Sequence, residues 1–294
     1  LLMLAPDSLS DPALQFAGER PTNLLMISLD TLRRDRIGRY DGSSRTDFLD
    51  SLFEQGVALD DHRSCSNWTY PGMLCALTGQ GPIDLGFIPM TNVSDDPESV
   101  PERIDFLGDW LGQAGYSTEL ITANSLIGEK FGFARAYQTL GEYSGKNAEG
   151  INGYATSALS SLRDQEQPWF LHLHYLDPHI PYDPPDEYLT ELEGLEPLDD
   201  EVYLKGVLVN VHDALDDYSE AELDLIKSHL RVRYNGEIAY LDDQLEVLFS
   251  TLEAYNILDD TLVVIYSDHG EQFWEHGEIL HHSGVYQEES DAIA

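Results

Sequence analysis

Residues 262–271 read LVVIYSDHGE, an apolar run that ends in a turn containing two acids and a histidine. A second run of the same form, NLLMISLDT, occupies residues 23–31. Near-continuous apolar runs are typical of strands that are covered on both faces. In open α/β sheets, ligands bind outside the carboxyl ends of the strands, so the two turns predict one functional edge.

Further apolar runs at residues 118–122 and 169–176 predict two more strands. Helical patterns lie between the runs and are expected over residues 47–55, 101–114, 154–165 and 219–254. This alternation predicts an α/β fold with a central, mostly parallel sheet sandwiched by helices. One catalytic domain is expected over residues 1–294, with residues 184–218, rich in Pro and acid, as an insert or lid.

The chain carries 54 acidic and 16 basic residues, which gives a formal net charge of −38. A nucleic-acid partner is excluded because phosphates require a basic patch, and anionic membrane surfaces would repel the chain. Self-repulsion of this size favours a protein of a high-salt organism, and the alternative is an acidic protein in ordinary salt. A calcium-buffering role is disfavoured because the chain has no D-x-D-x-D-G loop.

The termini and cysteines carry weaker signals. No apolar run approaches the length of a membrane span, and the opening LLMLAP lacks the basic start of a signal peptide. A cytoplasmic location is therefore favoured, although a start at Leu1 suggests missing upstream sequence. Cys65 and Cys75 form no C-x-x-C pattern, and we expect two small buried apolar residues.

Acidic residues end two of the predicted strands. Asp30 follows one strand and Asp268-His269 follows the other, so we expect these side chains to hold a metal ion. The alternative for either Asp alone is a turn or cap residue. Thr69 precedes a short helix that we expect to begin at Pro71, and it would lie where free N–H groups favour an anion. Its alternative role is a plain N-cap.

Histidines form a second group of candidates. His179 lies between two prolines in DPHIPY (177–182), a rigid mount for a side chain. His281 and His282 belong to a histidine-rich segment over residues 274–289. For His172 and His174, two residues apart on one strand, packing within the sheet is expected.

These motifs together resemble the sulfatase branch of the alkaline phosphatase superfamily, over residues 23–289. The matching segments, in order, are LLMISLDTLRRDRIGRYDG (24–42), FLDSLFEQGVALDDHRS (48–64), TYPGMLCALTG (69–79), DPHIPY (177–182), RYNGEIAYLDDQLEVLF (233–249), VVIYSDHGEQFWEHGE (263–278) and HHSGVYQEE (281–289). The resemblance implies one divalent metal ion, a small anionic ester as substrate, and the following roles. Metal ligands are Asp30, Asp268, His269 and Thr69; Thr69 is also the nucleophile, and His179 and His282 contact the ester or protonate its leaving oxygen.

Three positions depart from that branch. Thr69 stands where sulfatases have the Cys or Ser that becomes formylglycine, and Met73 replaces the Arg that follows. Thr cannot be converted to that aldehyde, so the resemblance predicts phosphoryl transfer from phosphate mono- or diesters through a phospho-Thr intermediate. Thr31 replaces a second metal-binding Asp, which favours Mn²⁺, Zn²⁺ or Mg²⁺ over Ca²⁺.

Two other functions stay open. A sulfatase would need Cys65 or Ser66 as the modified residue, and neither has the required spacing to the following Pro. A binding protein without catalysis would explain Gln287 in place of Glu, and Asn124-Ser125 where sulfatases have a GKW-like motif. Members of the branch continue into a smaller C-terminal subdomain, which we expect to be missing here. Hydrolysis versus transfer, and the oligomeric state, are left open.

Overall fold

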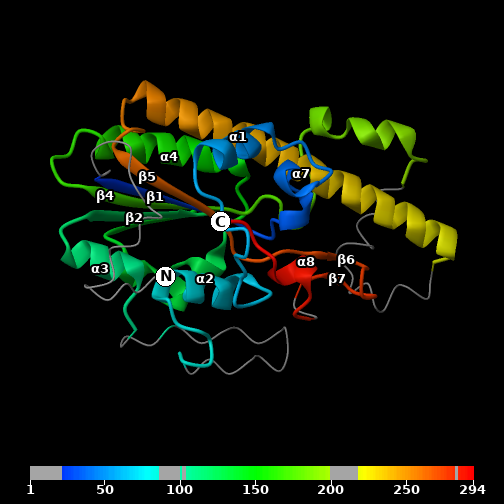
Figure 1. Cartoon of the computed structure of the whole chain (residues 1–294), viewed down its shortest axis with the longest axis horizontal. Helices are drawn as coiled ribbons and strands as arrows, with labels where there is room; N and C mark the ends of the chain where they lie inside the picture. The colour runs from blue at the N-terminus through cyan, green and yellow to red at the C-terminus, as the bar shows by residue number, and fades with distance from the viewer. Residues whose placement is uncertain (1–21, 86–99, 101–103, 199–217, 282–283) are drawn as a thin grey trace. The chain divides into compact units, whose positions relative to one another are not determined.

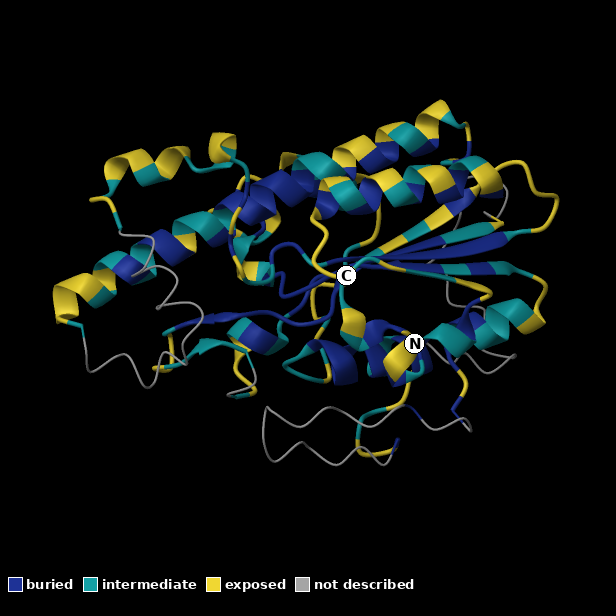
Figure 2. Ribbon diagram, turned by 180° about the vertical axis from the view of Figure 1, so that it is seen from behind, coloured by how far each residue is buried: buried dark blue, intermediate teal, exposed yellow. Residues whose placement is uncertain are grey.

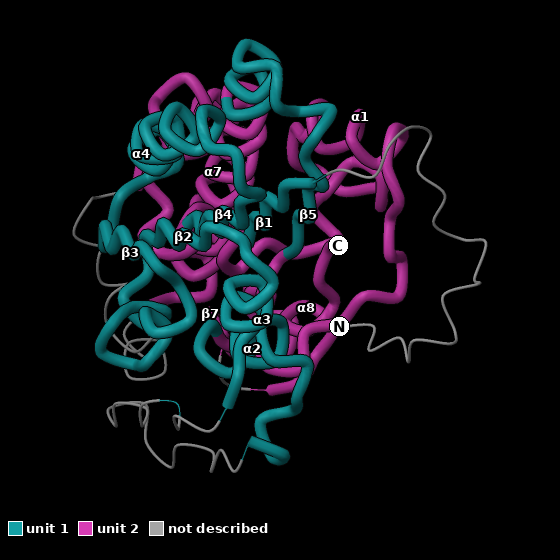
Figure 3. Tube along the Cα trace, turned by 90° about the vertical axis from the view of Figure 1, so that its left-hand side faces the viewer, with its two compact units in different colours: residues 1–28, 69–175, 248–266 teal, residues 29–68, 176–247, 267–294 magenta. Residues whose placement is uncertain are grey.

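A computed structural model describes residues 22–85, 100, 104–198, 218–281 and 284–294. These residues divide into two compact units, coloured teal and magenta in Figure 3. The first unit comprises residues 1–28, 69–175 and 248–266, and the second comprises residues 29–68, 176–247 and 267–294. That the whole chain forms one catalytic domain stays a prediction.

A mostly parallel five-stranded sheet is the centre of the first unit (Figure 1). Its strands in spatial order are β3 (Thr139–Glu142), β2 (Ser117–Thr122), β4 (Trp169–Tyr175), β1 (Asn23–Leu29) and β5 (Thr261–Ser267). Strand β2 pairs in parallel with both β3 and β4, with Leu120 opposite His172. The final residues of β1 and β5, Leu29 and Ser267, belong to the second unit.

The four predicted strands are confirmed, and their burial follows their place in the sheet. Every residue of the central strand β4 is buried, as Figure 2 shows for the middle of the sheet. Strand β5 is an edge strand, with Leu262 exposed to 42% and Val264 to 36%, so the expectation of cover on both faces is wrong there. The short edge strand β3, TLGE, has no apolar run that could predict it.

Helices of the first unit cover both faces of the sheet. Figure 1 shows α4 (Ala148–Leu162) on one side, and α2 (Thr69–Thr78) and α3 (Leu107–Gln113) on the other. Residues Ala155, Leu159 and Leu162 of α4 are buried at helical spacing. Helix α4 begins six residues earlier than predicted because Asn147 caps it by accepting a hydrogen bond from the Gly150 N–H. The apolar periodicity alone did not reveal this start.

The long helix α7 (Glu220–Ala254) runs from the second unit into the first. A capping box begins the helix, since the Ser219 N–H donates to Glu222 and the Glu222 N–H donates to the Ser219 hydroxyl. Within the second unit, Asp242 of α7 accepts hydrogen bonds from the Phe48 and Leu49 N–H groups. Asp242 thereby caps α1 (Asp47–Gln55), whose predicted bounds are confirmed.

Short elements complete both units. They are the 3₁₀ helices η1 (Arg34–Arg36), η2 (Gly38–Tyr40), η3 (Ser125–Ile127), η4 (Glu129–Phe131), η5 (Ala134–Ala136), η6 (Asp186–Tyr188) and η7 (Thr190–Gly194), the hairpin of β6 (Gln272–Phe273) and β7 (Ile279–Leu280), and α8 (Gln287–Ser290). The expected insert thus contains η6 and η7, and its residues 199–217 lie outside the described ones. Among the described helices, none is long and apolar enough to cross a membrane.

The expectation for the cysteines is wrong. Cys65 is exposed and Cys75 is only partly buried. Both are disulfide-bonded, and neither is free. A disulfide requires two sulfur atoms to meet in the folded chain, and the spacing in the sequence carries no signal for that.

Candidate metal and catalytic site

The carboxyl ends of β1 and β5 bring two predicted metal ligands together. The Asp268 N–H donates to the Leu29 carbonyl at 3.3 Å, and the Thr31 N–H donates to Asp268 Oδ1 at 3.3 Å. One ligand atom each from Asp30, Asp268 and His269 lies within 4.8 Å of the others, and all three residues are buried. This cluster belongs entirely to the second unit.

His269 has the tautomer that a metal ligand needs. Its Nδ1 lies 2.8 Å from the Gly270 carbonyl, which only accepts, so Nδ1 carries the proton. Its Nε2 lies 3.5 Å from Asp30 Oδ1 and 3.6 Å from Asp268 Oδ2. Burial lowers the pKa of His269 to about 3, so the imidazole is neutral at neutral pH. A neutral ring with its Nε2 directed at the two carboxylates suits a divalent cation held among them.

The carboxyl groups of the cluster also fit a cation. Burial, together with the negative charge of Asp30, raises the pKa of Asp268 well above its ordinary value. Asp268 Oδ2 and Thr31 Oγ1 are buried and have no hydrogen-bond partner. A divalent cation among these oxygens would relieve both the repulsion and the missing hydrogen bonds. The donor set of two carboxylates, one imidazole and a spare hydroxyl therefore fits a divalent metal.

Thr31 adopts an unusual backbone conformation at this point. Its φ is 56°, in the left-handed region that β-branched residues rarely adopt. The Tyr234 hydroxyl donates to the Thr31 carbonyl at 2.7 Å and helps to hold this turn. Strained backbone of this kind clusters at functional sites, which supports a role for the turn in ligand binding.

Thr69 is the first residue of α2 and is 2% exposed. The sequence predicted that this helix begins at Pro71, and it begins two residues earlier. Gly79, with a φ of 67°, follows the last helical residue. Thr69 belongs to the first unit, and its assignment as nucleophile and fourth metal ligand stays a prediction.

Asn124 contacts Thr69 and was not predicted as a site residue. Its Nδ2 donates to Thr69 Oγ1 at 3.4 Å. Its Oδ1 accepts the Leu126 N–H at 3.0 Å, which fixes the amide so that Nδ2 faces the threonine. Asn124 follows the carboxyl end of β2 by two residues, so its position after a strand could have indicated it, as could its place in the region where sulfatases have a GKW-like motif.

Histidines of the second unit gather beside His269. The His281 ring lies 4.6 Å from the His269 ring and 5.3 Å from the His179 ring, between ring centroids. His179 Nδ1 lies 2.6 Å from the Ile180 carbonyl, so its Nε2 is the nitrogen left for substrate. His282 lies outside the described residues, and its predicted role stays a prediction.

Glu271 orients His281. One carboxylate oxygen of Glu271 lies 2.6 Å from His281 Nδ1, and the other accepts the Tyr182 hydroxyl at 2.7 Å. Burial lowers the pKa of His281 to about 3, so the ring is neutral, with its proton on Nδ1 and a lone pair on Nε2. The family resemblance implied His282 for this role, and the sequence itself carries no signal that separates the two adjacent histidines.

The remaining predicted histidines of the sheet pack as expected. Ser28 Oγ lies 2.9 Å from His172 Nε2 and 2.8 Å from His174 Nδ1. The Tyr137 hydroxyl lies 2.9 Å from His172 Nδ1. All four residues are buried, and these hydrogen bonds satisfy polar atoms within the sheet.

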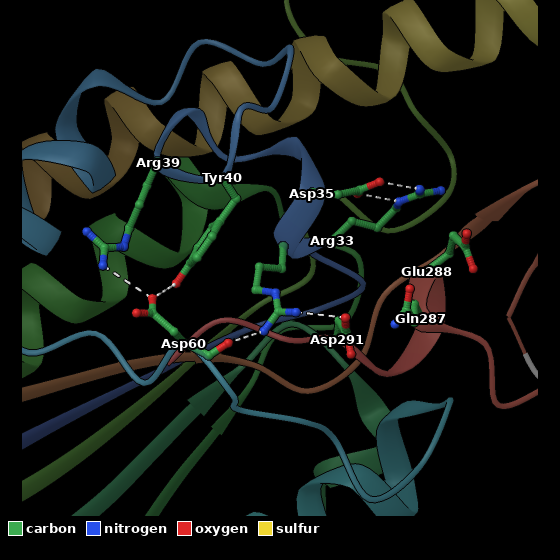
Figure 4. Close-up of a pocket in the computed structure, with 9 residues that line it drawn as sticks. Arg33, Asp35, Arg39, Tyr40, Asp60, Gln287, Glu288 and Asp291 are labelled. Atoms are coloured by element: carbon green, nitrogen blue, oxygen red, sulfur yellow. Dashed lines mark hydrogen bonds and ion pairs between the residues drawn. The ribbon is translucent and has the colours of Figure 1, made fainter.

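A pocket of about 700 Å³ in the second unit is separate from the metal cluster (Figure 4). It is lined by Arg33, Arg34, Asp35, Arg39, Tyr40, Asp60, Gln287, Glu288 and Asp291. Its three arginines are paired with carboxylates: Arg33 with Asp35, Arg34 with Asp291, and Arg39 with Asp60. The lining holds four acids against three arginines, so it offers no net positive charge to an anionic ester. The Arg34–Asp291 pair instead ties η1 to the residue after α8, and the Arg39–Asp60 pair ties η2 to the segment after α1.

The buried Asp/Asp/His cluster follows the carboxyl ends of β1 and β5, the position at which α/β proteins bind their ligands. The family model of the sulfatases matches residues 22–292, so this chain belongs to the sulfatase family.

Known relatives agree with this assignment. The chain is 27% identical to the choline-sulfatase of Rhizobium meliloti, over 87% of this chain and 58% of that protein. It is 24% identical to the ulvan-active sulfatase of Formosa agariphila, over 91% of this chain and 46% of that protein. The chain spans about half the length of the curated relatives it matches.

A solved structure supports the fold. The phosphonate monoester hydrolase of Agrobacterium radiobacter superposes with a TM-score of 0.69, at 19% identity, over 93% of this chain and 67% of that chain. The predicted α/β class with a central, mostly parallel sheet is confirmed by this likeness and by the sheet order.

Proposed function

We propose that this chain is a metal-dependent enzyme that transfers the phosphoryl group of phosphate esters through Thr69. The observation that carries the proposal is the identity of Thr69, which stands where the family has its modified nucleophile and cannot become an aldehyde. Thr69 is buried at the first residue of a helix, and its hydroxyl accepts from Asn124. A hydroxyl in that position acts directly as a nucleophile.

The proposed metal ligands are Asp30, Asp268 and His269, with Thr69 Oγ completing the set. A divalent cation there would favour the alkoxide form of a bound hydroxyl and offset negative charge on the phosphoryl oxygens. Thr31, a neutral residue, stands where many family members have another Asp, so the set carries two carboxylates and one imidazole. Such a set favours Mn²⁺, Zn²⁺ or Mg²⁺ over Ca²⁺.

In the proposed reaction, Thr69 Oγ forms a bond to phosphorus and the bond from phosphorus to the ester oxygen breaks. The hydroxyl proton of Thr69 must leave, and the departing oxygen must gain one. The His281 ring lies 5.3 Å from the His179 ring and 4.6 Å from the ring of the proposed metal ligand His269, so we assign proton transfer to His179 and His281. Water or an alcohol then attacks the phospho-Thr and releases the product.

Sulfate-ester hydrolysis is the second candidate, because the curated relatives named above are sulfatases. It would require a modified residue other than Thr69. Cys65 is disulfide-bonded, and a disulfide-bonded sulfur is not free for conversion to formylglycine. This counts against a sulfatase that uses Cys65 as its modified residue and leaves Ser66 as the remaining candidate for that modification.

A substrate panel tests the proposal. The chain is assayed with Mn²⁺, Zn²⁺, Mg²⁺ and Ca²⁺ on an aryl phosphate, a bis-aryl phosphate and an aryl sulfate. We expect phosphate-ester turnover that Thr69→Ala abolishes and Thr69→Ser partly retains. Thr78→Ala, which removes a buried hydroxyl from the same helix, is the matched control. Faster turnover of the sulfate with Thr69 intact would overturn the proposal, as would the absence of a phosphorylated Thr69 peptide after acid quenching.

A further inference from the structure

One side chain of α7 contacts both ends of the turn that carries His179. Glu237 Oε1 accepts the Asp183 N–H at 2.6 Å, after the turn. The carboxyl group of Glu237 is also hydrogen-bonded to that of Asp177, before the turn. Asp177 is 7% exposed and Glu237 is 6% exposed, so the contact is buried. His179 lies between these two attachments.

Two carboxyl groups can share a hydrogen bond only when one of them keeps its proton. Burial, with the negative charge of Asp177 next, raises the pKa of Glu237 to about 9. Asp183 adds a weaker negative charge from the same turn. Arg233, one helical turn earlier on α7, lies 3.7 Å from the Asp183 carboxylate. At neutral pH, the pair of Glu237 and Asp177 therefore holds one proton, which lies on Glu237.

We infer that Glu237, as a neutral carboxylic acid, is a positioning residue that fastens the turn 177–183 to α7 and thereby aims His179. It donates its proton to Asp177 and accepts the Asp183 N–H. The inference rests on the proposed function only for what His179 does. Loss of the proton would leave two buried carboxylates facing each other, and their repulsion would release the turn from the helix.

The packing around this contact makes α7 a suitable support. A Cβ atom at Gly236 would lie 2.9 Å from the Tyr188 carbonyl and 3.0 Å from a Pro184 side-chain carbon. The chain that follows the turn therefore approaches α7 closely, one residue before Glu237. A displacement of about 1 Å at a catalytic group can cost on the order of 100-fold in rate, so a turn fixed at both ends has a functional purpose.

The test compares Glu237→Gln, Glu237→Ala and the exposed control Glu246→Gln. An amide at position 237 keeps a neutral donor and acceptor but cannot lose a proton. The free energy of unfolding is measured from pH 5 to pH 9.5 for each protein. Because the pKa of Glu237 is raised from 4.5 to about 9 on folding, the wild type should lose stability relative to Glu237→Gln as the pH rises through that window. Parallel profiles for these two proteins would overturn the shared proton.

Activity provides the second measurement. Glu237→Gln should keep kcat at neutral pH, and it should lack the fall in kcat at alkaline pH that we expect for the wild type. Glu237→Ala should lower kcat by about 10-fold to 100-fold with unchanged metal affinity. Full kcat in Glu237→Ala would overturn the positioning role. A wild type without phosphatase activity would contradict the proposed function alone, since the stability profiles report on the shared proton independently.

Discussion

Asn124 donates its amide hydrogen to the hydroxyl oxygen of Thr69 across 3.4 Å, while its carbonyl oxygen is held by the Leu126 N–H. A donor to that oxygen favours the deprotonated form of the hydroxyl, because hydrogen bonds to a charged group are stronger than those to a neutral one. Sulfatases have a GKW-like motif with a lysine in this region, so the neutral amide also changes the charge next to Thr69, the proposed nucleophile.

Replacing Asn124 therefore tests whether its amide assists Thr69, the proposed nucleophile. We expect Asn124→Ala to lower kcat by about 10-fold to 100-fold, in line with the loss of one donor to an oxyanion. Asn124→Asp should be more damaging, because a carboxylate beside Thr69 disfavours the alkoxide. The measurement is kcat on an aryl phosphate, with metal affinity followed by calorimetry. Asn235→Ala, on α7, is the matched control. A kcat unchanged in both Asn124 variants would show that the amide does not act on the nucleophile.

Proton release should accompany metal binding. The pKa of Asp268 is raised by burial and by Asp30, so without a cation it holds a proton that a bound cation displaces. Apparent affinity for Mn²⁺ or Zn²⁺ should therefore rise with pH until Asp268 ionises in the metal-free protein. Calorimetry in buffers of different ionisation enthalpy counts the released protons. The Asp268→Asn variant should bind the metal ion weakly and should release no proton at this site. Binding without proton release in the wild type would contradict the protonated carboxyl.

Thr31 should set the choice of metal. Thr31→Asp adds a third carboxylate, so it should raise affinity for Ca²⁺ relative to Mn²⁺. Thr31→Val removes the buried, unpaired hydroxyl and should lower affinity for every cation if that hydroxyl is a ligand. Thermal shifts with each ion provide a readout that does not depend on activity. Equal shifts for wild type and Thr31→Asp with all ions would show that this position does not select the metal.

Much of the frame that carries the site could be predicted from local pattern. The apolar runs of β1 and β5 are continuous and end abruptly in acid, and parallel strands bring their carboxyl ends to one edge. This argument alone was enough to predict that Asp30 and Asp268 lie close together. Capping at Ser219 was equally readable, because its two hydrogen bonds join residues three apart in the chain.

The missed features depend on contacts between residues far apart in sequence. Asn124 and Thr69 are separated by 55 positions, and an asparagine after a strand otherwise predicts a turn. The pairing of Glu237 with Asp177 likewise depends on how α7 packs against a distant turn.

His281 and His282 should differ in their effect on catalysis. His281 is held by Glu271 and lies beside His269 and His179, so His281→Ala should lower kcat about 100-fold or more. His282→Ala is the adjacent comparison, and the sequence alone predicts the larger loss there. Glu271→Gln should move the pH profile away from that of the wild type, because it replaces the carboxylate beside His281 Nδ1 with a neutral amide. A larger loss in His282→Ala, with a normal profile in Glu271→Gln, would return the proton-transfer role to His282.

The net charge of −38 should make stability depend on salt. The screening length falls from about 10 Å at 0.1 M salt to about 3 Å at 1 M, so repulsion among the 54 acidic residues weakens as salt is added. Each kcal/mol of relieved repulsion should raise the melting temperature by about 2 °C for a chain of this size. Scanning calorimetry in KCl and in tetramethylammonium chloride at equal ionic strength separates screening from ion-specific effects, because screening depends on ionic strength alone. Similar rises in the melting temperature in both salts would support a chain adapted to high salt. A melting temperature that sucrose raises and that neither salt changes would show that the acidic residues do not serve such an adaptation.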